Sequence, residues 1–321
     1  MAFFEKLSHS TCVSALLVVY LISSLTGCQT NHSNDNYSAK TMNSSFHIVQ
    51  SDEEIKVLMD GDTSVIVVQS TRPDYRPYLH PIKAPGSEVN LTQFSPDHHK
   101  HQTGLFWGLT RVNGTGATPD EIREWFYRPD KPQDIQTKIG RDFFHNPAEG
   151  YWQKVSADVI SPTGREVAWQ TVYHMLDGAG NPLMEETQTW TFTENAGRYF
   201  LSLEWTGTAL RDMVINEFEY GGLFLRMPWD QNTEAEVINA ARQSNLQAEG
   251  QRAMWVDVGM ELPGLEGWGH IALFDHKDNP GFPQTWRVDG QFGVGSAVAA
   301  QGDIMISEGE ERMYRYQVVA Y

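Results

Sequence analysis

The chain has 321 residues, 40% of them hydrophobic, and a formal net charge of −17 at pH 7. This is enough chain to bury a large core, and the acidic balance disfavours nucleic acid and anionic lipid surfaces as partners. The sequence has no Gly-rich phosphate loop, no Gly-x-Ser-x-Gly elbow, no Cys-x-x-Cys pair and no His-Glu-x-x-His motif. Nucleotide hydrolysis, dinucleotide chemistry and zincin-type proteolysis therefore have no support.

The N-terminal segment contains an apolar run over residues 12–28 that is too short and too early for a lasting membrane span. This pattern predicts an export signal over residues 1–27. Its end, Leu25-Thr26-Gly27-Cys28, resembles the lipobox of bacterial lipoproteins, which implies cleavage before Cys28 and lipidation of its thiol. Gln29 follows instead of Asp, so we expect an outer membrane lipoprotein that faces the periplasm or the cell surface. An ordinary cleaved signal with a chance cysteine is the alternative.

Residues 28–45 are polar and aperiodic and predict a flexible tether. The second cysteine, Cys12, lies inside the predicted signal, so the mature chain cannot form an internal disulfide. Its stability must come from a hydrophobic core. We expect one domain over residues 46–321, attached to a membrane only through the lipid.

From residue 46 onward the pattern is that of β-strands. Residues 165–210 alternate most clearly, and Asp-Gly-Ala-Gly-Asn-Pro and Glu-Asn-Ala-Gly within them are hairpin signals. Two segments look helical, residues 118–127 and residues 234–245, and the first opens with a Thr-x-x-Glu capping box. Many strands with few helices predict an all-β fold, an antiparallel sandwich or barrel, of which a large β-sandwich is favoured. Further strand-like runs lie at residues 63–70, 251–260, 269–276, 303–309 and 312–321.

A cluster of histidines lies in the stretch DHHKHQTGLFWG, residues 97–108. In an extended segment His99 and His101 point to the same face, while His98 points to the other. Two imidazoles on one face can reach the same ligand, proton or metal ion. Trp107 offers an apolar wall or a platform on which a sugar can stack. The alternative is a solvated His98 beside one buried core histidine.

A polar face is predicted in RPDYRPYLHPIKAPGS, residues 72–87. Arg76, Tyr78 and His80 alternate and so share one side of a strand. An arginine, a phenol and an imidazole in a row can bind a carboxylate, a sulfate or sugar hydroxyls. Pro73, Pro77 and Pro81 leave an exposed edge segment as the alternative.

Paired carboxylates occur in NEFEYGGLFLRMPWD, residues 216–230. Glu217 and Glu219 share a face by alternation, and the following Gly-Gly pair lets the chain bend before Arg226. Such a pair is a candidate for general acid/base chemistry, particularly where burial raises one pKa. Two solvated strand residues are the alternative.

The last candidate stretch is residues 267–295, in which the strand-like IALF run ends in Asp-His. His276 is therefore expected where a strand passes into a loop, which is a common place for functional residues. The Pro, Gly and aromatic residues that follow, Trp286 among them, are typical of a cleft rim.

These stretches together resemble the DUF6807 family, often labelled methane oxygenase PmoA-like. The resemblance extends from Arg76 to Gly295. One residue is inserted after Asp97, so either His98 or His99 matches the first family histidine. The label denotes a multi-helix membrane subunit, which a chain with one hydrophobic run at its leader does not match. The family pattern Asp-His-x-His-(His or Gln)-x-Gly-(Leu or Ile)-aromatic matches His99, His101, Gln102, Gly104 and Leu105.

The resemblance implies a large β-sandwich similar to the galactose-mutarotase supersandwich, in bacteria that consume polysaccharides. We therefore expect an envelope-tethered, carbohydrate-active enzyme that performs elimination, hydrolysis or epimerisation on oligosaccharides from a complex glycan. In this hypothesis the acid/base residues are His99, His101, His276 and Glu219. The expected substrate-binding residues are Arg76, Tyr78, His80, Trp107, Arg226 and Trp286, with the arginines on a carboxylate or sulfate and the tryptophans on a sugar face.

Two alternatives remain open. The first is a non-catalytic glycan-binding lipoprotein with exposed aromatic side chains. The second is a divalent metal site with His99, His101 and His276 as three ligands and one open position. No other cofactor is expected.

Overall fold

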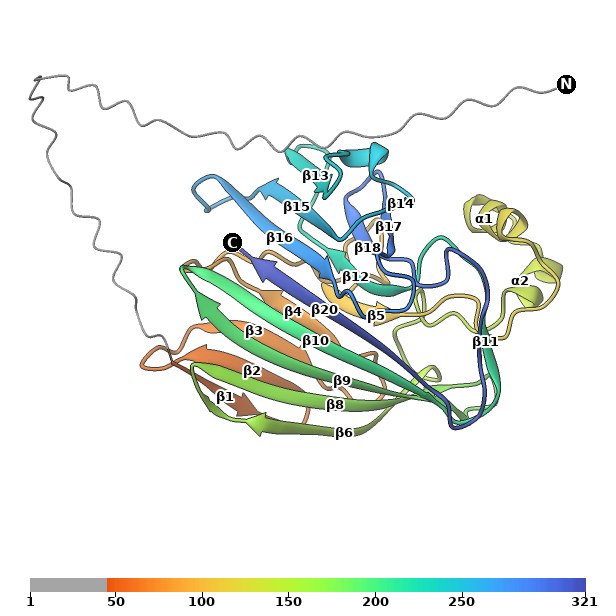
Figure 1. The fold of residues 1–321 in the computed structure, drawn as a ribbon, viewed down its shortest axis with the longest axis horizontal. Helices are drawn as coiled ribbons and strands as arrows, with labels where there is room; N and C mark the ends of the chain where they lie inside the picture. Colours follow the sequence, from red (N-terminus) through yellow and green to blue (C-terminus); the bar gives the residue numbers. More distant parts are fainter. Residues whose placement is uncertain (1–44) are drawn as a thin grey trace, which may run out of the picture. The chain divides into compact units, whose positions relative to one another are not determined.

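Two antiparallel sheets pack face to face across a shared hydrophobic core (Figure 1). The computed structural model describes residues 45–321. The predicted signal peptide, the predicted tether except Ser45, and the predicted lipidation of Cys28 lie outside the described residues. The predicted all-β antiparallel sandwich is confirmed.

One sheet has ten strands and the other has eight, and a separate pair lies beside them. In spatial order the ten-stranded sheet consists of β14 (Gln251–Arg252), β17 (Thr285–Val288), β18 (Gly293–Ser296), β12 (Gly222–Arg226), β5 (Leu105–Gly108), β4 (Tyr78–Ile82), β3 (Val65–Ser70), β2 (Glu54–Met59), β1 (Phe46–Gln50) and β7 (Thr163–Gly164). The eight-stranded sheet consists of β13 (Ala235–Asn239), β15 (Trp255–Glu261), β16 (Trp268–Asp275), β20 (Glu311–Ala320), β10 (Arg198–Ala209), β9 (Pro182–Asn195), β8 (Glu166–Leu176) and β6 (Trp152–Ser161). The pair is β11 (Met213–Ile215) with β19 (Ile304–Ile306).

The long hairpins β8–β9 and β9–β10 form where the turn signals predict them. In the second turn Ala196 and Gly197 have φ angles of 52° and 73°, the left-handed values that a tight hairpin turn requires. Along β9 the threonines point outward while Gln188, Trp190 and Phe192 are buried, as the strict alternation predicts.

The described residues include two short α-helices, α1 (Pro119–Tyr127) and α2 (Gln133–Ile139), and one 3₁₀ turn, η1 (Asn245–Gln247). The predicted capping box of α1 is present: the Thr118 side chain accepts from the Glu121 amide, and the Glu121 carboxylate accepts from the Thr118 amide. The sequence pattern did not predict α2. No helix of residues 45–321 is long and apolar enough to span a membrane.

The predicted helix over residues 234–245 is wrong. This segment forms β13 and a turn, and Val237 pairs with Val258 of β15. The turn is closed by Asn239, whose side chain accepts from the amides of Ala241 and Gln243. The edge-strand pairing and this Asx-type turn outweigh a modest helical propensity.

The functional region is built on the outer face of the ten-stranded sheet, near the end that carries β5, β12, β18 and β17. Alternation directs Trp286 and Val288 of β17 into the core and Arg287 outward. In the same way Phe106 and Phe224 face away from the core and pack together with Phe144. These outward side chains form the base of a pocket.

Candidate functional site

A pocket of about 240 Å³ opens on this outer face. Three histidines line it: His99 and His101 from the loop before β5, and His145 from the segment after α2. Aromatic side chains wall it, and Gln102, Arg287 and Asp289 contribute polar atoms. The aromatic residues are Phe126, Tyr127, Phe144, Tyr220 and Phe224.

The two histidines of the predicted pair lie together, but in a turn and not in a strand. The His99 amide donates to Pro96 and the Gln102 amide donates to His99, so the loop folds back on itself. The His99 and His101 ring centroids are 5.6 Å apart. His98 is exposed and does not line the pocket, although its Nδ1 is 3.2 Å from Nδ1 of His99.

Gly104 allows this loop to run close to β4. Its φ angle is 78°, and a Cβ there would lie 2.4 Å from the carbonyl oxygen of Leu79. Any other residue would push the loop away from the sheet. The histidines of the loop would move with it.

The third histidine is held by a carboxylate. His145 Nδ1 lies 2.7 Å from Asp142 Oδ2, and Asp142 Oδ1 accepts from the backbone amides of Phe144 and His145. The Asp142 carboxylate therefore fixes the His145 ring with Nδ1 as donor, which leaves Nε2 free to accept a proton. The ring also stacks on Phe126 of α1, with centroids 4.7 Å apart.

His101 and His145 face each other, with ring centroids 4.5 Å apart. Burial, and then the neighbouring His145, lowers the pKa of His101 far below its usual range. Burial, together with the Arg226 charge, lowers the pKa of His99 to about 4. Both of these imidazoles are therefore neutral near pH 7, and each can accept a hydrogen bond at one nitrogen and donate one at the other.

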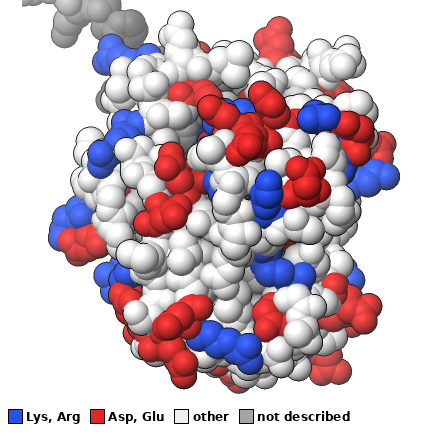
Figure 2. Space-filling view, turned by 90° about the vertical axis from the view of Figure 1, so that its right-hand side faces the viewer, with Lys and Arg blue, Asp and Glu red and all other residues white. Residues whose placement is uncertain are grey.

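The positive charge at the pocket wall is already paired. Arg287 donates to Glu249 and lies 3.7 Å from Glu219, which also accepts from Arg123 of α1 at 2.5 Å. Acidic and basic side chains are interspersed, with no continuous basic patch, on the face drawn in Figure 2. Burial raises the pKa of the Tyr220 phenol well above its usual value, so this hydroxyl stays protonated.

The structure contradicts the ligand-binding role predicted for the two arginines. Arg76 and Arg226 are both 0% exposed. Arg76 donates to the carbonyls of His101, Phe143 and Phe144 and to Thr103. Arg76 therefore ties the His101 loop to the segment that carries His145.

Arg226 acts in a similar way on the other side of the pocket. It donates to the Gln102 side chain, the Gln291 carbonyl and Asp289 Oδ2, the last at 3.2 Å. The terminal nitrogens of Arg76 and all three guanidinium nitrogens of Arg226 donate to the chain's own acceptors, and Arg76 Nε is buried without a partner among residues 45–321. Both arginines therefore connect the segments that surround the pocket.

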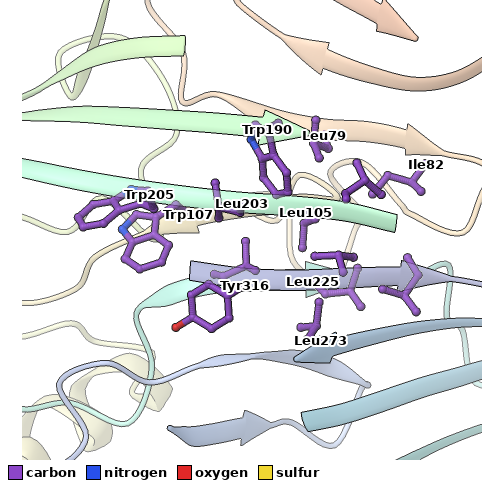
Figure 3. Close-up of a cluster of buried hydrophobic side chains, with 14 of the residues drawn as sticks. Leu79, Ile82, Leu105, Trp107, Trp190, Leu203, Trp205, Leu225, Leu273 and Tyr316 are labelled. Carbon is purple, nitrogen blue, oxygen red and sulfur yellow. The ribbon is translucent and has the colours of Figure 1, made fainter. Parts of the chain in front are cut away.

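The predicted sugar-stacking tryptophans are core residues, which corrects that expectation. Trp107 is 1% exposed and stacks on Trp205, with ring centroids 4.1 Å apart (Figure 3). Trp286 is also 1% exposed and donates to the Ala253 carbonyl at 2.7 Å. Neither ring presents a face to a ligand.

Tyr78 and His80 lie on the same sheet face but outside the pocket. Tyr78 packs against Tyr75 and Phe94, and His80 Nδ1 lies 3.0 Å from the Thr92 hydroxyl. Burial lowers the pKa of His80 to about 4. Glu219 does not line the pocket either, and touches it only through Arg287.

His276 lies elsewhere, which contradicts its place in both the acid/base set and the alternative metal site. It borders a hollow on the outer face of the eight-stranded sheet, beside Glu204 and Arg315. The structure therefore does not bring it to His99 and His101. Among residues 45–321, no three His, Cys, Asp or Glu side chains are arranged to hold a metal ion.

Sequence reasoning missed His145, Asp142, Phe126, Arg287 and Asp289. The segment RDFFHNP carried a signal, an acidic residue three positions before a histidine among aromatics, but nothing linked it to the His99 loop. Arg287 and Asp289 follow Trp286 within the candidate stretch of residues 267–295, and their spacing of two residues is that of side chains on one face of a strand.

A family model matches residues 55–321, and its description reads "Family of unknown function (DUF6807)". The chain belongs to the DUF6807 family. The match includes every residue of the pocket. No curated protein matches this DUF6807 chain.

Solved structures similar to this DUF6807 protein include a galactose mutarotase-like protein from Lactobacillus casei, with 8% identity and a TM-score of 0.37, over 86% of this chain and 100% of that one. Another is an α-galactosidase from Lactobacillus brevis, with 10% identity and a TM-score of 0.35, over 90% of this chain and 40% of that one. A GH36 α-galactosidase from Geobacillus stearothermophilus has 9% identity and a TM-score of 0.34, over 86% of this chain and 40% of that one. The fold assignment itself rests on the strand order and pairing described above.

Proposed function

We propose that this DUF6807 protein is an enzyme that performs acid/base chemistry on a sugar in the histidine pocket. The observation that carries the proposal is the facing pair His101 and His145, with His145 oriented by Asp142. A side chain oriented by a buried carboxylate, next to a second titratable group in a concave site, is the arrangement that proton transfer requires.

The pair divides the chemistry between two imidazoles. His145 donates from Nδ1 to Asp142, so its Nε2 can take a proton from a substrate hydroxyl or carbon. The Asp142 carboxylate stabilises the imidazolium that results. His101 or His99 can donate a hydrogen bond to the substrate or accept one from it on the other side, since both line the same pocket. This arrangement serves elimination, hydrolysis or epimerisation, and the product distinguishes them.

The lining supports a sugar as the substrate. Phe126 and Tyr127 offer apolar ring faces above a base that includes the buried Phe144, while Gln102 and Asp289 offer groups that hydrogen-bond hydroxyls. A mixture of ring faces and a few convergent polar atoms is typical of small-molecule sites. The volume of about 240 Å³ accommodates one ring at a time, so a longer oligosaccharide would extend out of the mouth.

We also propose that the protein acts at the cell envelope, attached through a lipid on Cys28. The support is the sequence Leu25-Thr26-Gly27-Cys28 after an apolar run. Oligosaccharides released from a complex glycan would meet the enzyme there.

The test is turnover of a panel of plant and algal oligosaccharides, followed by mass spectrometry and by ultraviolet absorbance for unsaturated sugars. Wild-type protein is compared with His101→Ala, His99→Ala and His145→Ala. The matched control is His174→Ala, because the side chains of His174 and His145 are both 23% exposed and both contact a carboxylate.

The proposal expects a product with wild type and His174→Ala and at least about 100-fold less of it with His101→Ala or His145→Ala. The mass change then names the reaction. Binding of oligosaccharides without turnover on any of them would contradict the proposal and favour a non-catalytic glycan-binding protein.

A further inference from the structure

A second hollow, of about 370 Å³, lies on the outer face of the eight-stranded sheet. The histidine pocket lies on the outer face of the other sheet, so the two are on opposite sides of the sandwich. Ala272 and Val319 form the floor of the hollow. Their neighbours along the strands point into the core, so these two side chains point outward. They are nevertheless only 4% and 7% exposed. Large side chains around these two residues shield them from solvent.

The strand register places aromatic side chains around this floor. Trp255 lies directly opposite Phe274, and Ala272 lies opposite Val319 on the next strand. The Trp255 and Phe274 rings are 6.3 Å apart, and Phe274 remains 36% exposed. Phe200 and Tyr321 also line the hollow, so ring faces border it on several sides. Outward aromatic side chains around a small-residue floor form a shallow binding surface.

An acidic group without a full set of partners lies in the same hollow. Asp257 is 9% exposed, and its Oδ2 lies 2.9 Å from Nδ1 of His270. Its Oδ1 is buried and has no hydrogen-bond partner among residues 45–321. Burial, and then the Asp257 charge, raises the pKa of the Tyr321 phenol to about 12, so this hydroxyl stays protonated. A buried acceptor without a donor is unfavourable, and a ligand hydroxyl would satisfy it.

We propose that this hollow binds a sugar ring of an uncharged glycan. The apolar face of the ring packs on Trp255 and Phe274, and a hydroxyl donates to Oδ1 of Asp257. An apolar protein surface docked here would bury the carboxylate without a donor, which is costly. Arg198 also lines the hollow, 5.1 Å from the centroid of the Tyr321 ring, so the hollow carries one charge of each sign. The net charge of −17 then disfavours an anionic glycan.

This site holds a glycan and does not transform it. Asp257 is paired with His270, the Tyr321 phenol beside them stays protonated, and no pair of imidazoles lines this hollow as His101 and His145 line the histidine pocket. A polymer bound on one face of the sandwich would keep the enzyme near its substrate and raise the local concentration of chain ends. The choice of a glycan rests on the proposed function, but binding here does not require turnover.

The experiment is isothermal titration calorimetry of the purified protein with cellohexaose, xylohexaose, mannohexaose and maltohexaose, one at a time. Wild type is compared with Trp255→Ala and Phe274→Ala. The matched control is Trp268→Ala, because Trp268 begins the same strand as Phe274 and has a similar exposure of 37%, yet does not line the hollow. Thermal melting of each variant checks that it is folded.

The proposal expects saturable binding of at least one hexasaccharide, about fivefold to tenfold weaker in Trp255→Ala and Phe274→Ala and unchanged in Trp268→Ala. It also expects that binding survives in His101→Ala, even where that variant has lost turnover. If Trp255→Ala fails to fold, it is replaced by Trp255→Phe, which keeps an aromatic ring. The affinity of Trp255→Phe for the hexasaccharide should be weaker than that of wild type but still measurable.

Three results would overturn the proposal. One is no binding of any hexasaccharide by folded wild type at millimolar concentration. Another is binding that Trp255→Ala and Phe274→Ala leave intact, which assigns all affinity to the histidine pocket. The third is a wild-type dimer in sedimentation equilibrium that Trp255→Ala converts to a monomer, which means that a second copy covers this face.

Discussion

The imidazole rings of His101 and His145 face each other at 4.5 Å, although they come from two separate loops. Arg76 connects those loops, since its guanidinium donates both to the His101 carbonyl and to the carbonyls of Phe143 and Phe144. The buried Arg76 therefore helps to hold the two loops in the positions that bring His101 and His145 together.

Asp142→Asn tests the orientation of His145. An asparagine keeps the oxygen that accepts from the Phe144 and His145 amides, so the fold should persist. The amide cannot stabilise an imidazolium, and kcat should fall by at least about 100-fold. Steady-state kinetics on the best oligosaccharide measure this. A change in KM with kcat preserved would mean that Asp142 serves only the loop structure.

Arg76→Lys tests the connection between the loops. A lysine cannot reach three carbonyls with one planar fork, so buried acceptors lose their donors. We expect the free energy of unfolding to fall by about 2–4 kcal/mol, measured by urea denaturation. Arg165→Lys, at an exposed position, is the control and should change it by less than about 0.5 kcal/mol. Equal stability of the two variants would contradict the role of Arg76.

Much of the fold followed from local signals. The hairpin turns at Asp177–Asn181 and Glu194–Gly197 and the cap at Thr118 depend on neighbouring residues alone, and all three are confirmed. The helix predicted over residues 234–245 was wrong because pairing with another strand, β15, decides the conformation of this segment. Local pattern carries no information about that partner.

The site was only partly predictable for a similar reason. His99 and His101 are neighbours in sequence, whereas His145 joins them through contacts that only the folded chain makes. In LFWG both faces of the strand are apolar, so alternation separates Phe106 from Trp107 without saying which one enters the core. The ligand-binding role predicted for Arg76 and Arg226 was wrong because the sequence does not show that a side chain is buried or which backbone carbonyls it contacts.

Glu186 should make the stability of the protein depend on pH. This carboxyl is 1% exposed between the sheets, where Oε1 accepts from Gln188 and Trp205. Burial raises its pKa from 4.5 to about 7. Between these values the folded state holds a proton that the unfolded state has lost, so stability falls as pH rises from about 4.5 to 7 and is then constant.

The Glu186 contribution across that interval is on the order of 3 kcal/mol. Glu186→Gln keeps the acceptor for Gln188 and Trp205 without the ionisation, so it should remove this component and stabilise the protein at pH 8 more than at pH 5. Urea denaturation at both pH values measures the difference. The same effect of the substitution at both pH values would show that Glu186 does not titrate in this range.

Cys28→Ser tests the predicted lipid anchor, which lies outside the described residues. Bacteria that express the full chain with a labelled fatty acid should incorporate the label into wild type, and the protein should sediment with membranes. Cys28→Ser should lose the label. Cys12→Ser is the matched control and should keep it, because Cys12 lies in the predicted signal. Label in Cys28→Ser would mean that lipid is attached elsewhere.

The most direct measurement of the central claim is a double-mutant cycle on kcat/KM with His101→Ala, His145→Ala and the double variant. Residues that serve one proton-transfer step as a unit are strongly non-additive. We predict that the double variant loses about as much activity as either single variant, a factor of about 10² to 10⁴. Single losses that multiply in the double variant, or single variants with wild-type activity, would show that the two histidines do not act as a catalytic pair.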